Sequence, residues 1–474
     1  MTTAPVIAPH HAGGAGAALF DEPDPDFAHI AARVDRLISA IDAALTRQVN
    51  AILGAPQVRA LEARWRALAR LVAQAGSDGQ VIVRVFDAAW PEVVRDLDRA
   101  VEFDQSHLHR LVHDGEFGMP GGVPFGLIVG DYAVSSATDR TRGDQVETLA
   151  RLSAVGAGAF CPIVLGAAPD LLGVESYDRI APHTDLSERR PSQSERAQNM
   201  RWSALRKQED TRFLGLVAPD LVIRAPRTRL SPARADGFTF DEDLRAPLTV
   251  TGAFGFAVTV VAAYLRSGWF AAIRGAQDEA QGAGTVPGWP GHDLGVDCHG
   301  LSRQPPATLR LTATQEDALI ARGVIPLSTL PMSETAVFNA NPSLHQPARF
   351  GTGIASENAR ISAMLQYVLC TSRFAHYLKV LMRDEIGSVA PPEVIEKGLN
   401  DWLRGYCLGN EDADPALKAQ YPLRDASARV APLPGRPGAY AATIRLQPHF
   451  QLDDISTSFH LVSEAPAGVE RAIA

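Results

Sequence analysis

Two uninterrupted apolar runs constrain the fold of this chain more than any other feature of its sequence. The first is FGLIVGD at 125–131, and the second is PIVLGA at 162–167. Strands of a parallel sheet are covered on both faces, so they consist of continuous hydrophobic residues rather than alternating ones. A helix predicted to end near Val155 separates the two runs. The region is therefore predicted to be α/β, with a buried sheet and flanking helices.

Further elements are expected on either side of this unit. QVIVRVFD at 80–87 is interpreted as a strand, and Pro91 is expected to open a helix that reaches about His113. A helix is also predicted at 249–267, stopped by Gly268, and a short one follows with Thr314 as its cap. The other strands expected here are TRFLGLVAP (211–219), LVIRAP (221–226), GWFAAI (268–273), TLRLT (308–312) and VIPLSTL (324–330).

A long helical hairpin is predicted at 27–76. Apolar residues recur at spacings of three or four from Phe27 to Ile52, which is the period of an amphipathic helix. A Gly-Ala-Pro sequence at 54–56 ends the first helix, and a second helix stops at Gly76. An ordinary core hairpin and packing against partner helices both explain this pattern. The interface candidates in this region are Leu37, Ile41, Leu45 and Trp65.

The pattern changes near residue 354, where we expect a domain boundary. About 33 helical residues lead to Ile386, another helix follows, and three strands are expected after Tyr421. The last two strands alternate apolar and polar residues, as half-buried strands do. The predicted domains are a flexible arm (1–26), the helical hairpin (27–76), the main α/β region (77–353) and a C-terminal domain (354–474).

The charge and cysteine content exclude several classes of function. The net charge is −9, from 45 basic and 54 acidic residues, and no stripe of Lys and Arg is interleaved with aromatic residues. Nucleic acid and membrane surfaces are therefore not expected as partners. The longest apolar run, at 253–265, is too short to span a membrane. The four cysteines are widely separated, which favours reduced thiols, and the N-terminus lacks a secretory signal. A cytoplasmic protein is expected.

No group of residues predicts convergent chemistry. GAGAFC at 156–161 follows a helix rather than a strand, so it indicates a helix stop and not a dinucleotide loop. His109 and His113 share one helical face and could bind zinc, but a third ligand must come from elsewhere, and solvated positions on the helix are the better interpretation. Asp131 follows a buried strand, where open α/β sheets place functional groups, but a carboxylate in a turn or a helix cap is the better interpretation. Cys298 and His299 are neighbours in sequence, whereas a Cys–His nucleophile pair normally needs residues that are brought together by the fold. We therefore assign no nucleophile there.

The stretch SRFAHYLKVLMRDEIGS (372–388) concentrates charged residues and His376. As a helix it has an apolar stripe and a side of mixed charge, and nothing is placed to orient His376 as a base. We therefore assign no catalytic residue, no cofactor and no metal.

Six ordered stretches together resemble the large sheath subunit of type VI secretion systems, the TssC/VipB family. They are LEARWRALARLV (61–72), DLDRAVEFDQSHLHRLVHDGEFGMPGGVPFGLIVGDYAVS (96–135), EDTRFLGLVAPDLVIRAP (209–226), GWFAAIRG (268–275), SRFAHYLKVLMRDEIGS (372–388) and GRPGAYAATIRLQPHFQLDDISTSFHLVSE (435–464). The resemblance covers nearly the whole chain from about residue 27.

The resemblance implies a non-enzymatic building block with a contractile-tail-sheath-like α/β fold of mixed sheets. Such proteins pair with a small sheath subunit and with copies of themselves, surround the rings of an inner tube, and stand on a baseplate. We hypothesise that Ala439–Leu446 and Ile455–Val462 join a sheet shared between subunits, the alternative being an intrachain hairpin. The interface candidates there are Tyr440, Ile444, Leu446, Ile455, Phe459 and Leu461.

The sequence also departs from this family. Its members usually carry a short N-terminal amphipathic helix that docks a disassembly AAA+ ATPase, whereas the arm before Phe27 is rich in Gly and Ala. The ATPase is therefore a doubtful partner. Two alternatives stay open: a diverged paralogue that does not polymerise, and a cytosolic α/β enzyme that uses Asp131 or the His109 and His113 pair.

Overall fold

The computed structural model describes most of the chain in fifteen segments. They are residues 25–136, 143–186, 193–227, 240–242, 247–276, 283–289, 291, 304–330, 333–348, 350–351, 353–384, 391–410, 412–432, 440–449 and 459–464. Two compact units make up the chain: residues 1–60 with 226–246, and residues 61–225 with 247–474.

The first unit is dominated by helix α1, which spans Pro25–Gly54. Helix α2 (Pro56–Ala75) begins after the single residue Ala55, so both predicted helices are present. The side chain of Asn50 in α1 donates a hydrogen bond to the carbonyl oxygen of Asp241, at 3.1 Å. The packing of the two helices as a hairpin stays a prediction.

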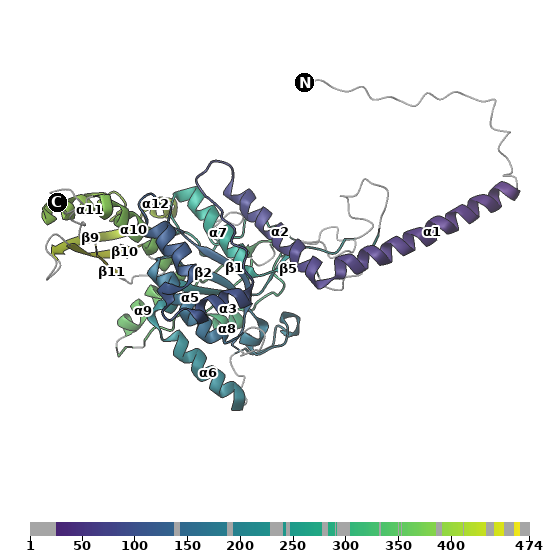
Figure 1. Cartoon of the computed structure of the whole chain (residues 1–474), viewed down its shortest axis with the longest axis horizontal. Helices are drawn as coiled ribbons and strands as arrows, with labels where there is room; N and C mark the ends of the chain where they lie inside the picture. The colour runs from purple at the N-terminus through teal and green to yellow at the C-terminus, as the bar shows by residue number, and fades with distance from the viewer. Residues whose placement is uncertain are drawn as a thin grey trace, which may run out of the picture. The chain divides into compact units, whose positions relative to one another are not determined.

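A four-stranded parallel sheet lies at the centre of the second unit (Figure 1). Its strands are β1 (Ile128–Val134), β2 (Ile163–Ala167), β3 (Leu214–Ala218) and β6 (Val324–Pro326), in the order β1-β2-β3-β6. All three pairings between neighbours are parallel. The α/β prediction from the two apolar runs is confirmed.

Two separate hydrophobic cores cover the faces of this sheet, which explains why β2, β3 and β6 consist of apolar residues. The edge strand β1 differs, because it contains Asp131, which the sequence placed after the strand. Val164 and Val217 contact the core that contains helix α7 (Gly252–Ser267). Their neighbours Ile163 and Leu165 belong to the other core, with helix α5 (Gln145–Gly158). Since successive side chains of a strand point to opposite faces, a strand between two cores has no polar side.

A second layer of structure follows residue 353. Helices α9 (Gly353–Ser362), α10 (Leu365–Asp384), α11 (Pro392–Arg404) and α12 (Pro415–Gln420) precede strands β9 (Leu423–Pro432), β10 (Tyr440–Pro448) and β11 (Phe459–Glu464). The strands form an antiparallel sheet in the order β11-β10-β9. The one long helix predicted at 354–386 is therefore two helices, broken at Ala363 and Met364.

The remaining elements are shorter. They are α3 (Trp90–Arg99), the 3-10 turn Phe103–Gln105, α4 (His107–His109), a π-helix (Arg110–Phe117), the 3-10 turns Pro169–Leu172, Tyr177–Arg179 and Glu209–Phe213, α6 (Gln193–Arg206), β4 (Leu221–Arg224), β5 (Leu248–Val250), α8 (Ala313–Ala321), β7 (Ser328–Thr329) and β8 (Ala336–Val337). Gly268 ends α7 with φ 76°, as its position in the sequence predicts.

Several sequence predictions are wrong in detail. Residues 80–87, 268–273 and 308–312 form no strand in the described chain. Next to the last of these, backbone pairing is limited to a bridge between Ala307 and Leu221 and a hydrogen bond from the Thr308 amide to the carbonyl oxygen of Asp220. The helix expected from Pro91 to His113 ends at Arg99 and is replaced by short turns and a π-helix. Thr312, not Thr314, caps α8: its side chain accepts a hydrogen bond from the backbone of Gln315.

Candidate assembly surfaces

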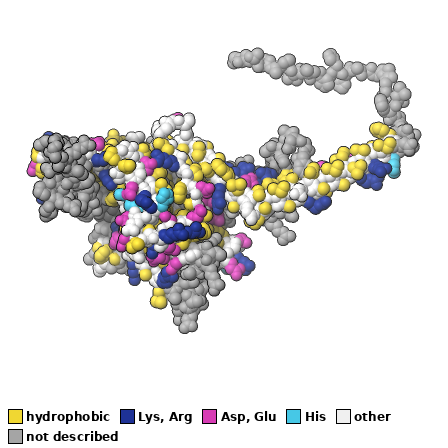
Figure 2. Space-filling view, viewed as in Figure 1, with side chains coloured by type: hydrophobic (Ala, Val, Ile, Leu, Met, Phe, Trp, Pro, Cys, Tyr) yellow, Lys and Arg dark blue, Asp and Glu magenta, His cyan; other side chains and the backbone are white. Residues whose placement is uncertain are grey.

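Helix α1 carries an apolar stripe that is exposed among the described residues. Leu37, Ile41 and Leu45 have exposed fractions of 57, 58 and 46%. Figure 2 shows hydrophobic side chains following one another along this helix. Their spacing of four residues places them on one face, as the sequence predicts. Single exposed apolar residues are ordinary on a protein surface, but a continuous row of them marks an interaction site.

Helix α2 has one exposed and one anchored face. Trp65 is 63% exposed, whereas the small residues Ala63 and Ala67 are buried against the core. Two side chains of the helix bind the body of the protein: Glu62 pairs with Arg224 at 2.8 Å, and Arg64 pairs with Asp131 at 2.6 Å. Asp131 therefore anchors α2 through its ion pair with Arg64, which is a structural role rather than a catalytic one.

The two edges of the C-terminal sheet differ among the described residues: side chains of α11 bind the β9 edge, and no described strand pairs with the β11 edge. Outside β9, the side chain of Asn400 in α11 donates to the carbonyl oxygen of Ala428 and accepts from its amide, at 2.8 and 2.9 Å. Glu396 accepts a hydrogen bond from the amide of Val430 at 2.9 Å. These side chains occupy the backbone groups that a further strand would use. At the other edge, β11 has no strand beyond it in the described part of the chain.

The sequence-derived candidates on this sheet fall into different environments. Ile444 and Leu446 are buried in the core of their own chain, and Tyr440 is partly buried beside it. In the strand register, Phe459 pairs with Leu446 and Leu461 pairs with Ile444, so β10 and β11 form an intrachain hairpin. Ile455 lies outside the described residues. Both edges of β10 are therefore paired within the chain, and the sheet shared between subunits stays a prediction.

The charged side of α10 is bound within the chain. Lys379 lies 3.4 Å from the ring centre of Phe117, and Arg383 donates to the carbonyl oxygen of Met119 at 2.9 Å. His376 is buried, and its Nε2 lies 3.0 Å from the carbonyl oxygen of Ala159. Burial lowers the pKa of His376 to about 4, so the ring is neutral at physiological pH. Lys379 and Arg383 therefore join α10 to the body of the protein.

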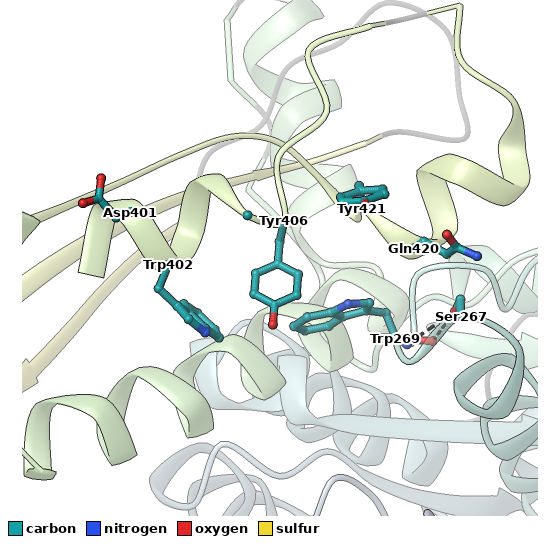
Figure 3. A pocket seen from close by; sticks show the side chains of 8 residues that line it. Ser267, Trp269, Asp401, Trp402, Tyr406, Gln420 and Tyr421 are labelled. Carbon is teal, nitrogen blue, oxygen red and sulfur yellow. Dashed lines mark hydrogen bonds between the residues drawn. The ribbon is translucent and has the colours of Figure 1, made fainter. Parts of the chain in front are cut away.

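An aromatic cleft lies where α11 meets the loop after α7 (Figure 3). Its volume is about 620 Å³, and Tyr406 stands between the two indole rings of Trp269 and Trp402, at 5.1 and 5.0 Å. Trp269 also stacks on Phe374 at 4.2 Å. Asp401, the acidic residue of the lining, points away from the rings in Figure 3 and pairs with Arg404. The cleft therefore offers apolar contact rather than an acid–base pair.

One cluster of metal-binding residue types occurs among the described residues. Ligand atoms of His109, His113 and Asp114 lie within 4.8 Å of one another. The two imidazole rings stack at 4.7 Å, and Nδ1 of His113 lies 2.8 Å from the Asp114 carboxylate. Burial and the nearby His113 lower the pKa of His109. These are the residues that could hold a transition metal, and the sequence had singled out the two histidines.

The remaining candidates for chemistry are held apart. Burial raises the pKa of both the Cys161 and Cys370 thiols, to about 12 for Cys370, so neither is poised as a nucleophile. Cys298 and His299 lie outside the described residues. Sequence reasoning missed Asp220, whose pKa is raised to about 7 by burial and by the Asp131 carboxylate. Its position just after strand β3 was the available signal.

No helix in the described residues is long and apolar enough to cross a membrane.

Comparisons with known proteins give the following similarities. The profile of the EvpB/VC_A0108 tail sheath N-terminal domain, named VipB, matches residues 35–345. The profile of the EvpB/VC_A0108 tail sheath gpW/gp25-like domain matches residues 354–465. The type VI secretion system sheath protein TssC1 of Pseudomonas aeruginosa is 32% identical over 450 residues, which cover 92% of this chain and 86% of that protein.

Two solved structures are similar at lower levels. The baseplate of the anti-feeding prophage has a TM-score of 0.38 and 10% identity, and the match covers 80% of this chain and 82% of that one. A sheath tail protein from Listeria innocua has a TM-score of 0.33 and 10% identity, with 67% and 59% covered.

Proposed function

This chain belongs to the VipB family of type VI secretion sheath proteins, and from that membership we propose that it polymerises with a small sheath subunit around an inner tube in the bacterial cytoplasm. It is a structural subunit of a contractile sheath. Contraction of such a polymer against a baseplate propels the tube. The protein's part in this process is mechanical, and we assign it no catalytic step.

The observation that carries the proposal is the exposed stripe on α1. A 30-residue helix is about 45 Å long, which suits a partner that also presents a long helix. Burying a Leu or Ile side chain stabilises a complex by roughly 1.5–3 kcal/mol. Leu37, Ile41 and Leu45 together can therefore hold the small subunit, and Trp65 on α2 adds an aromatic contact of the kind that dominates interfaces.

The C-terminal sheet supplies the connection between successive subunits in this proposal. A polymer that contracts must keep its connections while neighbouring subunits rotate. Backbone hydrogen bonds between strands suit this demand, because they depend little on side-chain packing. The edge of β11 is available for such a strand, whereas α11 blocks β9.

The test is co-expression of the full chain with the small sheath subunit encoded beside it, followed by negative-stain microscopy. Hollow tubes support the proposal. The variant L37D/I41D places two charges on the stripe and should abolish the complex. Loss of about 3–6 kcal/mol corresponds to at least a hundredfold weaker association.

The matched control is S39D/A43D, which adds the same charge to the opposite face of α1 and should still give tubes. A soluble heterodimer that never forms tubes would favour the non-polymerising paralogue. No complex between the two unmodified proteins would refute the proposal.

A further inference from the structure

The helical segment at 107–117 contains a buried imidazole nitrogen without a hydrogen bond. His109 is 6% exposed, so the solvated position expected for it from the sequence is wrong. Its Nδ1 has no hydrogen-bond partner among the described residues. Buried polar atoms almost always have a partner, and where the protein offers none the partner is a water molecule or an ion. The groups around Nδ1 therefore decide which of these fits.

Two further metal-binding side chains lie beside this nitrogen. The ring of His113 stacks on that of His109 at 4.7 Å between centroids, and Nδ1 of His113 lies 2.8 Å from the Asp114 carboxylate. One ligand atom from each of the three residues lies within 4.8 Å of the other two. The sequence left the third ligand to a distant segment, whereas the Asp114 carboxylate already lies beside the pair. Two imidazoles and one carboxylate are a donor set of zinc sites.

The charges around the cluster favour a cation over water. The pKa of His109 is lowered, first by burial and then by His113, so its ring is neutral at physiological pH. A neutral imidazole is the form that binds a metal. The carboxylates of Asp114 and Asp104 act on this ring in the opposite direction, because both place negative charge near it. A divalent cation is attracted by both carboxylates, and an uncharged water molecule gains much less.

The backbone holds the two histidines in an unusual helix. Helix α4 ends at His109, and a π-helix continues over Arg110–Phe117. π-Helices are rare and occur frequently at functional sites. The start of α4 is fixed by the Asp96 carboxylate, which accepts hydrogen bonds from the amides of His107 and Leu108, each at 3.0 Å. The imidazoles are therefore presented by a supported backbone, as a binding site requires.

We propose that His109, His113 and Asp114 bind one zinc ion. Ligands of a tetrahedral zinc site lie about 3.4 Å from one another, so the three ligand atoms need to approach only slightly. The His113 ring must also turn out of the stack, because nitrogen lone pairs lie in the ring plane and parallel rings cannot both point at one ion. This turn is easy, since the terminal torsion of histidine is broad. Asp114 is exposed, so water can occupy the fourth position.

The proposed ion would brace the contact between this segment and α10. Phe117, at the end of the π-helix, lies 5.5 Å from the His113 ring and 5.2 Å from the His376 ring, measured between centroids. Nζ of Lys379 in α10 lies 3.4 Å from the centre of the same Phe117 ring. Fixing His113 therefore restricts the movement of a residue on which α10 packs. The role of the zinc ion is structural.

Metal binding is tested on the complex of the full chain with the small sheath subunit, purified without a histidine tag and stripped with a chelator. Calorimetric titration with Zn²⁺ should give one ion per large subunit, and Co²⁺ in its place should give the visible absorption of a tetrahedral site. Excess Mg²⁺ should not compete, because it prefers oxygen ligands. The proposed site lies within one chain, so the chain alone serves if no complex forms. A protein that binds neither Zn²⁺ nor Co²⁺ overturns the proposal and leaves the proposed function intact.

Three substitutions assign the ion to this cluster. His109→Phe keeps a ring to pack against Phe103 and removes the buried nitrogen, and His113→Ala removes the second imidazole. Each should weaken Zn²⁺ binding by about a hundredfold or more and abolish the rise in thermal midpoint that Zn²⁺ produces. The matched control is His107→Ala, because this exposed histidine lies two positions from His109 and should not contribute. Unchanged binding in His109→Phe and His113→Ala, or an equal loss in all three variants, overturns the proposal.

Discussion

Replacing Asn400 by Ala should loosen β9 selectively, because this one side chain satisfies both backbone groups of Ala428. Its amide nitrogen donates to the carbonyl oxygens of Ala428 and Glu396, each at 2.8 Å, and its oxygen accepts from the amide of Ala428 at 2.9 Å. Ala428 is 5% exposed, so water does not readily replace the lost partner.

The expected cost follows from these contacts. A buried donor or acceptor left without a partner costs about 1–3 kcal/mol. The amide and the carbonyl of Ala428 would both be left without a hydrogen-bond partner, although relaxation of the strand toward α11 can reduce this cost. We therefore expect a loss of about 2–4 kcal/mol in the free energy of opening of this strand. Asn400→Asp keeps the acceptor for the amide and should lose less.

Native-state hydrogen exchange at Ala428 and Val430 is the suitable assay, because a chain with several domains does not unfold in one step. Lys397→Ala, on the exposed side of the same helix, is the control. A change below about 0.5 kcal/mol at Ala428 in the Asn400→Ala variant would refute the reasoning, since ordinary surface substitutions have effects of that size.

Three further outcomes are expected. Asp220→Asn should raise the free energy of unfolding by up to about 4 kcal/mol at pH 8 and by less at pH 5. The pKa of Asp220 is about 7 in the folded chain against an ordinary 3.8, so the cost of burying its ionised carboxylate grows as the pH rises from 3.8 to 7. Equal effects at both pH values in denaturant titrations would contradict this. Trp269→Ala should cost about 3–5 kcal/mol through lost contacts with Phe374 and Tyr406, measured by calorimetry. Alkylation followed by mass spectrometry should label Cys407 before Cys161 and Cys370, since those two are fully buried.

The central sheet could be predicted because burial on both faces leaves a direct trace in composition. Ile163 and Val164 contact opposite cores, so neither can be polar. The stripe of α1 was equally accessible, since an exposed and a buried apolar face have the same period. The sequence could not reveal whether the apolar face of α1 is buried in the chain or exposed. Leu37 and Ile41 are exposed in the chain, which favours the partner-helix alternative.

The wrong sequence predictions have a common physical cause. Whether a segment pairs depends on which other segments lie beside it in the fold, and its own composition does not show this. Residues 80–87 have strand composition, yet no strand of the described chain pairs with them, so they form no strand there. Conversely, the blocked edge of β9 depends on Asn400 and Glu396, two ordinary polar residues of a helix. His376 looked like a surface residue because its acceptor, the carbonyl of Ala159, is more than two hundred positions away in sequence.

The contacts of Asn400 and Glu396 with β9 also restrict the edge at which the C-terminal sheet can gain a further strand. A sheet with two free edges can grow both ways, and identical chains could then join in more than one order. Closing one side leaves a single way to add the next chain. In the proposed sheath, this would prevent two chains from joining in the wrong orientation at their first contact.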